Sequence, residues 1–271
     1  MQSKFRAAYD TIYHRTIKIL DDEVAISFSE RVSPNCYNLK ELGGAITNRE
    51  DERLANLFSV NKVIYIDTPV ILAVSNLQAT NIVHWEDLDQ LLKTKKPNYI
   101  HEKGLIDKLL SDEVLDGETA FDSQTASFVY KRKDGLQIDL LSCATGIKSF
   151  AILQILYQSG HLDNKTLLIL DEPETHLHPE WIVQYARLVV MLQKVIGVSF
   201  LINSHNPDMV MAIKYIAKKE LANPKATNFY LAKNNDAYTY NYELSETDIE
   251  PIFQSFNASL DKINMYGGTA E

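Results

Sequence analysis

The sequence lacks any apolar run of the roughly 18 to 20 residues that a membrane-spanning helix requires. Its first ten residues, MQSKFRAAYD, also lack the apolar core of a secretory signal peptide. Cysteine is scarce, since Cys36 and Cys143 are the only two and lie too far apart for a CxxC pair. We therefore expect a cytoplasmic protein with no membrane partner and with two reduced thiols.

An excess of positive charge is also missing. The formal net charge of -9 argues against a chain coated in nucleic-acid-binding surface, although it leaves room for a local basic patch. Two short basic clusters, KTKK at 93–96 and KRK at 131–133, are most simply solvated surface. The 271 residues are 45% hydrophobic and carry charges of both signs, which predicts a globular protein with a sizeable core.

Repeats, low-complexity tracts and heptad runs long enough for a coiled-coil arm are absent as well. The first half instead shows short, separate patterns. Its expected elements are an amphipathic helix at 3–20, a short strand at 24–29, a loop and a polar helix within 31–57, two β-branched runs at 62–74 broken at Thr68-Pro69, and a helical stretch at 85–115 broken near Pro97. The last of these is expected to form a separate small lobe.

The second half alternates strands and helices. Its expected elements are a hairpin at 126–140 with Gly135 in the turn, a helix at 146–159, a strand at 166–170, a helix at about 180–195, a strand at 198–203, a helix from Pro207, a hairpin at 227–244 and a short final helix. This order predicts an α/β fold, with a mainly parallel sheet flanked by helices, a small helical lobe and β-hairpins. The expected parts are the core segments 1–74 and 126–271 and the lobe 75–125.

Two carboxylates, Asp171 and Glu172, follow the buried apolar strand TLLIL at the point where it ends. Ligands bind at the carboxyl ends of strands in open α/β sheets, so chemistry is expected here. Asp171 suits a Mg²⁺ ion, which prefers oxygen ligands, and Glu172 could orient or deprotonate a water molecule. The simpler alternative is that both acids only cap the next helix.

The next strand, VSFLIN, ends in Ser204-His205-Asn206-Pro207. If the two strands are parallel, His205 lies at the same edge of the sheet as the carboxylates, where its imidazole could hydrogen-bond a terminal phosphate. A lone histidine at a strand end is more often a cap or a surface residue. The pairing with Asp171 and Glu172 favours the functional interpretation.

The segment LLSCATGIKSF joins a strand to a helix through small and hydroxylated residues. Backbone N–H groups at a helix N-terminus bind anions, Gly146 permits close approach of a phosphate, and Ser142 and Thr145 offer hydroxyl groups. Ordinary N-capping by Ser or Thr is the alternative. The GIKS string is not a phosphate-binding P-loop, G-x-x-x-x-G-K-[ST], because Ile147 separates Gly146 from Lys148, and no complete P-loop occurs in the printed sequence.

Together these strings resemble the ABC-type ATPase superfamily, in particular the stand-alone bacterial AAA-like ATPases with an ABC fold, relatives of the overcoming-lysogenization-defect, SMC and RecF groups. ATGIK is similar to the signature motif, LLILDEPETHLHPE to the Walker B motif followed by the D-loop, and LINSHNPDMV to the switch-histidine motif. The resemblance is strongest over about 127–218. It implies a P-loop NTPase-like fold and a site for ATP and Mg²⁺.

Carried over residue by residue, the resemblance implies Asp171 as a Mg²⁺ ligand, Glu172 as the catalytic base and His205 as the contact of the γ-phosphate. Thr145 and Gly146 would reach the nucleotide of a second protomer, and the remaining residues assigned to cofactor binding are Ser142 and Lys148. The residues assigned to the D-loop at the dimer contact are Glu174, His176 and His178. The expected partner is therefore a second copy in a head-to-tail dimer, at least transiently.

The main departure from this superfamily is that no string in the sequence matches its Walker A loop. We expect either that the chain begins downstream of that loop or that the protein has lost it, so this chain alone should bind ATP weakly and hydrolyse it negligibly. The stretch after His205 is also too short for the nuclease domain of the lysogenization-defect group. A nuclease or other effector would thus be a separate protein, and DNA or RNA is a further candidate partner.

Two other interpretations stay open. A non-hydrolysing scaffold derived from such an ATPase would explain the missing loop, although the set of Asp171, Glu172 and His205 argues against it. A zinc hydrolase could use His176 and His178, but the sequence has no HExxH string and a zinc site needs three convergent ligands.

Overall fold

The computed structural model describes residues 25–30, 33–38, 60, 62–74, 83–223, 227–234, 240–245 and 249–267. The predicted helices at 3–20 and before residue 57 lie outside this part of the chain. Strand β1 (Ala25–Glu30) confirms the predicted short strand and pairs antiparallel with β2 (Ser33–Asn38). The sequence predicted a loop from residue 31 onward, and this is wrong for β2. Pro34 is tolerated in that strand because both strands of a two-stranded ladder are edge strands.

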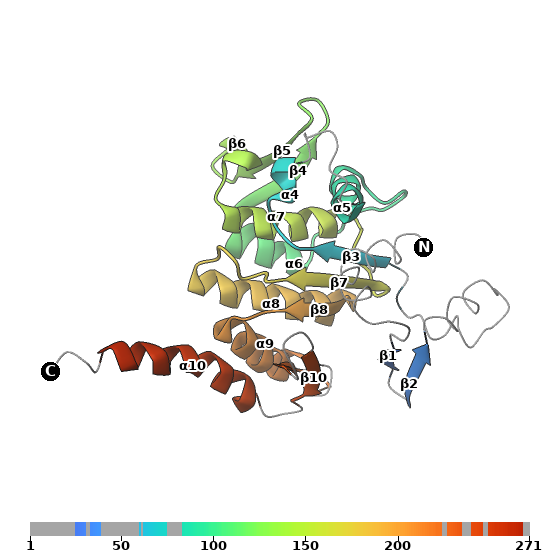
Figure 1. Ribbon diagram of the computed structural model, residues 1–271. Coiled ribbons are helices and arrows are strands. Elements are labelled where there is room, and N and C mark those ends of the chain that lie inside the picture. The colour runs from blue at the N-terminus through green and yellow to red at the C-terminus, as the bar shows by residue number, and fades with distance from the viewer. Residues whose placement is uncertain are drawn as a thin grey trace.

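Three parallel strands form the centre of the described chain, in the order β3-β7-β8. They are β3 (Lys62–Ile66), β7 (Thr166–Asp171) and β8 (Ser199–Asn203). The helices α7 (Thr145–Gln158), α8 (Pro179–Ile196) and α9 (Pro207–Glu220) alternate with β7 and β8 along the chain (Figure 1). The predicted α/β fold with a parallel sheet flanked by helices is confirmed.

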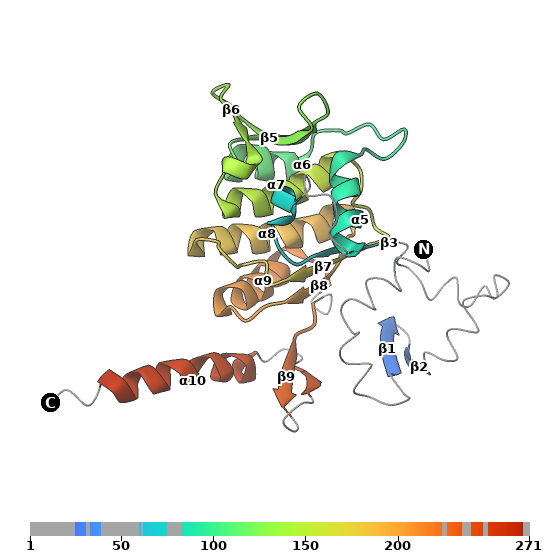
Figure 2. The same cartoon turned by 45° about the horizontal axis from the view of Figure 1, so that its top comes forward.

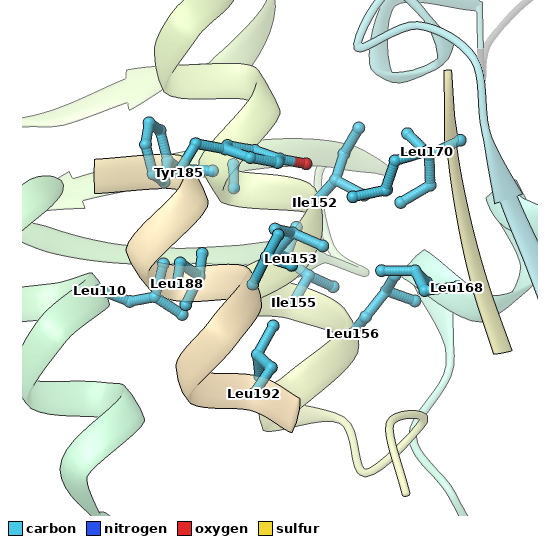
Figure 3. Packing of buried hydrophobic residues seen from close by; sticks show 14 of the residues in the cluster. Leu110, Ile152, Leu153, Ile155, Leu156, Leu168, Leu170, Tyr185, Leu188 and Leu192 are labelled. Carbon is cyan, nitrogen blue, oxygen red and sulfur yellow. The ribbon is translucent and has the colours of Figure 1, made fainter. Parts of the chain in front are cut away.

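One face of this sheet packs against α7 and α8. Figure 3 shows Leu156 and Ile152 of α7 beside Leu168 and Leu170 of β7, and Leu188 and Leu192 of α8 belong to the same buried cluster. Full burial of one such leucine contributes about 1.5–3 kcal/mol. The prediction that all of TLLIL is buried is wrong in detail, because Leu167 and Ile169 point to the other face and are only half-buried.

Local sequence signals set the ends of the helices beside the strands. His178 and Asn206 are the N-caps of α8 and α9, and a proline follows each of them, where its fixed φ suits the first helical turn. Helix α8 ends at Gly197, which adopts a left-handed φ of 87°. Each helix therefore follows a strand end after a short turn, which brings the polar residues of those turns to one edge of the sheet.

A second, antiparallel sheet covers the other side of α7. It contains β4 (Gly117–Asp122), β5 (Ser127–Arg132) and β6 (Gln137–Asp139), and Gly135 in the β5–β6 turn has a φ of 89°. The predicted hairpin is confirmed. Strand β4 was not predicted and lies within the range expected for the helical lobe; its buried Thr119 is held by a hydrogen bond from its backbone N–H to Gln154 of α7.

The predicted helical stretch is confirmed as α5 (Val83–Lys93) and α6 (Leu105–Asp107), which continues as a wider helical turn over Lys108–Val114. The break falls at 94–104 and includes Pro97. Of the two β-branched runs before it, the first is β3, whereas the second opens the short helix α4 (Ile71–Val74). The division into the ranges 1–74, 75–125 and 126–271 stays a prediction.

The C-terminal part forms the predicted hairpin, β9 (Tyr230–Asn234) and β10 (Tyr240–Leu244), followed by α10 (Glu250–Gly267). Helix α10 has 18 residues, so the prediction of a short helix is wrong. In Figures 1 and 2 it runs away from the other elements. Among the helices that the structure describes, none combines the length and the apolar character needed to cross a bilayer.

Candidate functional site

Asp171 ends the central strand β7 and is held from both neighbouring strands. The Asn203 side-chain amide of β8 donates a hydrogen bond of 2.7 Å to Oδ1 of Asp171, and the Tyr65 hydroxyl of β3 donates one of 3.2 Å to Oδ2. Burial raises the pKa of the Tyr65 hydroxyl, and the Asp171 carboxylate raises it further, so the phenol stays protonated and remains a donor. The carboxylate is thus fixed in place, while each oxygen keeps a lone pair for another ligand.

Glu172 turns the chain away from the strand. Its φ of 44° lies in the left-handed region, which costs free energy for a residue other than glycine, and its N–H donates a hydrogen bond of 2.8 Å to the Asn203 carbonyl. The exposed carboxylate reaches Nδ1 of His205 at 3.0 Å. The structure therefore brings Glu172 and His205 together at the ends of two adjacent parallel strands.

Glu174, which was assigned to the dimer contact, instead faces the interior. Its side chain is only 4% exposed, and its Oε1 accepts hydrogen bonds from the Ser204 hydroxyl at 2.7 Å and from the His205 N–H at 3.2 Å. The assignment of Glu174 to the dimer contact stays a prediction. The sequence pattern did not show the burial of its side chain, because the D-loop string does not indicate which of its residues points inward.

A cavity of about 160 Å³ lies beside Asp171 and Glu172 at the carboxyl ends of β3 and β7. Residues from four elements and their turns line it: Ile66, Asp67, Thr68, Pro69, Ser149, Ile152, Leu170, Asp171, Glu172, Pro173, Thr175, His176 and Tyr185. Its walls combine apolar side chains with carboxylates and hydroxyls. This is a polar-rimmed hollow at the edge where open α/β sheets bind ligands.

Asp67 is a site residue that the sequence interpretation missed. It follows β3 and lines the cavity. The Trp85 Nε1–H donates a bifurcated hydrogen bond of 2.9 Å to both oxygens of the Asp67 carboxylate. His84 Nε2 lies 3.1 Å from Oδ2 of the same carboxylate. Burial alone would raise the pKa of Asp67, but these hydrogen bonds outweigh it and lower that pKa below its usual value. The signal was present in KVIYIDTP, a second apolar strand that ends in Asp.

The signature-like residues lie at the start of α7 and not in the cavity. Thr145 and Gly146 open the helix after Ala144, which provides no side-chain cap, so the alternative of ordinary Ser or Thr capping is not what the structure shows. Lys148 donates a hydrogen bond of 2.8 Å to the Leu141 carbonyl, beside the exposed Ser142. None of the four predicted cofactor-binding residues lines the cavity beside Asp171.

Gly146 has a packing role that the sequence interpretation did not foresee. A Cβ at this position would lie 3.0 Å from the ring of Trp181 and 3.3 Å from Cδ2 of Leu177. The glycine thus lets α7 pack closely against the start of α8. Its presence is explained by this contact whether or not a phosphate also approaches it.

The two D-loop histidines remain on the surface. His176 adopts a left-handed φ of 69° at the rim of the cavity, and His178 Nδ1 accepts a hydrogen bond of 3.4 Å from the Glu180 N–H. Within the described residues, no group of three or more His, Cys, Asp and Glu side chains converges in a way that could hold a metal ion on its own. The histidine spacing therefore receives no support as the core of a zinc site.

Comparison with solved structures finds remote similarity to SMC head domains. The head from Thermotoga maritima is 14% identical over 66% of this chain and 55% of that chain, with a TM-score of 0.36. A head with a coiled coil and joint from Pyrococcus yayanosii gives 10% identity, 66% and 32% coverage and a TM-score of 0.41. The head of Pyrococcus furiosus, bound to the C-terminal domain of ScpA, gives 10% identity, 59% and 36% coverage and a TM-score of 0.38.

The chain spans only 32% to 55% of the length of these three chains. No curated protein matches it. The family described as "AAA domain, putative AbiEii toxin, Type IV TA system" matches residues 73–210, about half of the chain and the part that contains Asp171, Glu172 and His205. The chain belongs to this AAA domain family.

Proposed function

We propose that this chain supplies the metal-binding and water-activating part of an ATP-hydrolysing site of the ABC type. The observation that carries the proposal is the contact of 3.0 Å between Glu172 Oε1 and His205 Nδ1, beside the fixed carboxylate of Asp171. Paired carboxylates and an imidazole at the ends of adjacent parallel strands form the arrangement that phosphate chemistry needs, namely a metal ligand, a base and a phosphate contact.

Asp171 is the proposed ligand of Mg²⁺. Mg²⁺ takes oxygen ligands and usually keeps several water molecules, so one or two carboxylates and the phosphates of a nucleotide suffice to hold it. The Asp171 oxygens fit this role because Tyr65 and Asn203 orient them and leave lone pairs free. Bound there, Mg²⁺ would neutralise charge on the phosphate oxygens.

Glu172 is the proposed base. Its carboxylate is exposed at the rim of the cavity, where it can accept the proton of a water molecule, and the left-handed turn directs it away from Asp171. His205 lies within reach of the same space and would donate a hydrogen bond to the terminal phosphate. The Glu172–His205 contact holds the two side chains close together in the chain without a ligand.

A second copy of the domain is the proposed partner. Thr145, Gly146, Ser142 and Lys148 lie outside the cavity, yet the first amide groups of α7 have no side-chain cap and are suited to a phosphate. A head-to-tail dimer would bring this helix start to the nucleotide held by the other copy. His176 and His178, both exposed, would lie at that contact. The buried Glu174 would support the D-loop from the interior of its own chain.

The phosphate-binding loop that completes such a site has no matching string in the printed sequence. Without its backbone N–H groups and lysine, the nucleotide phosphates lack their main set of donors. We therefore expect that the chain alone binds ATP more weakly than micromolar and has negligible turnover. Isothermal calorimetry and a phosphate-release assay test this; micromolar binding with ordinary turnover would contradict it.

The process that ATP hydrolysis drives is proposed only as a general class. The description of the family names a putative toxin of a type IV toxin–antitoxin system. Phage-defence work with a separate nuclease or effector is the wider proposal, and it rests on the resemblance to the ABC-type ATPases. Direct binding of DNA or RNA by the basic clusters is not favoured, because several of their cations pair with acids of the chain: Lys93 with Asp89, Lys96 with Asp163, Arg132 with Asp134, and Lys133 with Asp112 and Asp116.

A non-hydrolysing scaffold is the second candidate function. The missing loop supports it, and the intact geometry of Glu172 and His205 opposes it. The two are separated by extending the chain at its amino terminus with a strand and a phosphate-binding loop. Turnover of ATP by the extended protein supports the enzyme, whereas tight binding without turnover supports the scaffold.

A further inference from the structure

Glu174 is a buried carboxylate without a role in the chemistry proposed above. Its exposed fraction is 5%, whereas Glu172 and His176 on the same turn are exposed. It lies three residues after the strand end, so its side chain reaches under the turn toward β8. Burying a charged group costs free energy unless strong hydrogen bonds compensate, so the contacts of this carboxylate show what it does.

Both donors to Glu174 belong to the turn that carries His205. The Ser204 hydroxyl donates a hydrogen bond of 2.7 Å and the His205 N–H one of 3.2 Å, and both reach the same oxygen, Oε1. The Ser204 hydroxyl in turn accepts a hydrogen bond of 3.2 Å from the Asn206 N–H. A single carboxylate oxygen therefore ties the turn after β7 to the turn after β8.

The carboxylates of Glu172 and Glu174 both lie on the Nδ1 side of the His205 ring. Its Nδ1 lies 3.0 Å from Glu172 Oε1 and 3.9 Å from Glu174 Oε1. Two carboxylate oxygens on one ring nitrogen favour a proton on that nitrogen, since a deprotonated Nδ1 would oppose a lone pair to each of them. With Nδ1–H committed to the carboxylates, Nε2 is the ring nitrogen left to face a ligand. It can donate a hydrogen bond to a phosphate oxygen only when the ring carries protons on both nitrogens.

The other oxygen of Glu174 shows that the contact is not optimal for stability alone. Oε2 is buried and has no hydrogen-bond partner in the described part of the chain. An unsatisfied buried polar atom lowers the stability of the fold. Burial, and to a smaller extent the Glu174 carboxylate, also raises the pKa of the Tyr185 hydroxyl. The carboxylate is thus poorly accommodated as a packing element and well placed as an acceptor for the His205 turn.

We infer that Glu174 is a positioning residue: its buried carboxylate holds the Ser204–His205 turn against the Glu172 turn and keeps Nδ1 as the protonated nitrogen of His205. The consequence for phosphate contact rests on the proposed function, because only then does the orientation of Nε2 matter for turnover. The positioning itself is a property of the chain without nucleotide, so it can be tested separately.

The test is the ring ¹⁵N spectrum of His205 in the full chain without nucleotide, assigned by comparison with His205→Gln. In the wild type we expect the Nδ1–H form to predominate. In Glu174→Ala the ring should shift toward the tautomer mixture of an exposed histidine, whereas Glu174→Gln, whose amide oxygen still accepts both hydrogen bonds, should largely retain the wild-type spectrum. Glu180→Ala on the exposed first turn of α8 is the matched control and should change nothing.

An unchanged His205 tautomer in folded Glu174→Ala would overturn the inference. If Glu174→Ala does not fold, Ser204→Ala removes one of the two donors and should produce a smaller shift in the same direction, and an unchanged spectrum there overturns the inference equally. Because no nucleotide is present, a failure here leaves the proposed ATPase activity standing. Loss of the proposed activity would likewise leave this result standing.

Discussion

The side chain of Asn203 donates a hydrogen bond of 2.7 Å to Asp171, the residue beside it in the parallel register. The backbone carbonyl of the same Asn203 accepts the N–H of Glu172 at 2.8 Å. One residue at the end of β8 therefore fixes both the metal-binding carboxylate and the turn that directs the base. The candidate site depends on this contact between neighbouring strands as much as on the carboxylates themselves.

Replacing Asn203 with Ala should loosen Asp171 at a modest cost in stability. The bond lies on the exposed edge, so its loss should lower the free energy of unfolding by about 0.5–1 kcal/mol. Urea unfolding measures this change. Ser199→Ala at the exposed start of the same strand is the control and should have a smaller effect; equal effects would contradict a specific role for the amide.

Replacing Gly146 with Ala tests whether this glycine serves packing. The new methyl group would press on Trp181, whose ring is held edge-on against Phe150 with centroids 5.6 Å apart. Overpacking costs about 1–3 kcal/mol and outweighs the gain in helix propensity of up to about 1 kcal/mol, so we expect net destabilisation. In a double-mutant cycle, Trp181→Leu should relieve much of this cost. Additive effects of the two changes would refute the contact.

Replacing Trp85 with Phe should weaken the attachment of Asp67 to α5, where His84 remains its other partner. The loss of the bifurcated hydrogen bond from Nε1 to this carboxylate should cost about 1.5–3 kcal/mol at neutral pH and raise the pKa of Asp67 toward its usual value. Because the folded pKa of Asp67 is lowered, its stabilising contribution is present above about pH 4 and is lost as the pH falls through the folded value. The difference between variant and wild type should therefore shrink in acid.

Urea midpoints at pH 7, 5 and 3.5 would follow this effect. The control is the other tryptophan: Trp181→Phe has no carboxylate partner among the described contacts, so its cost should not vary over the same range. A Trp85→Phe cost that is constant with pH would show that the indole contributes only packing.

The sequence predicted those parts of the site that depend on short strings. The strand TLLIL, the pair Asp171-Glu172 and the strand ending in His205 are each local patterns, and the parallel order of strands follows from the alternation with helices. Their meeting at one edge then follows from geometry. This is why the central elements of the fold were predictable from one sequence.

Contacts between distant segments were not predictable. Asp67 and Tyr65 come about a hundred residues before Asp171, and no string spacing indicates that β3 is the neighbour of β7. The inward direction of Glu174 depends on the left-handed turns at Glu172 and His176, which sequence patterns do not specify for residues other than glycine. Strands β2 and β4 were missed because they lack a strong alternation of apolar residues.

The most direct test of the account is ATP turnover of Glu172→Gln in the protein extended with a phosphate-binding loop. Removing the base should lower turnover at least about 100-fold and leave an ATP-bound dimer that light scattering detects, because binding and dimerisation do not need the proton acceptor. Glu86→Gln on the exposed side of α5 should match the parent. Turnover of Glu172→Gln equal to that of the parent would contradict the account.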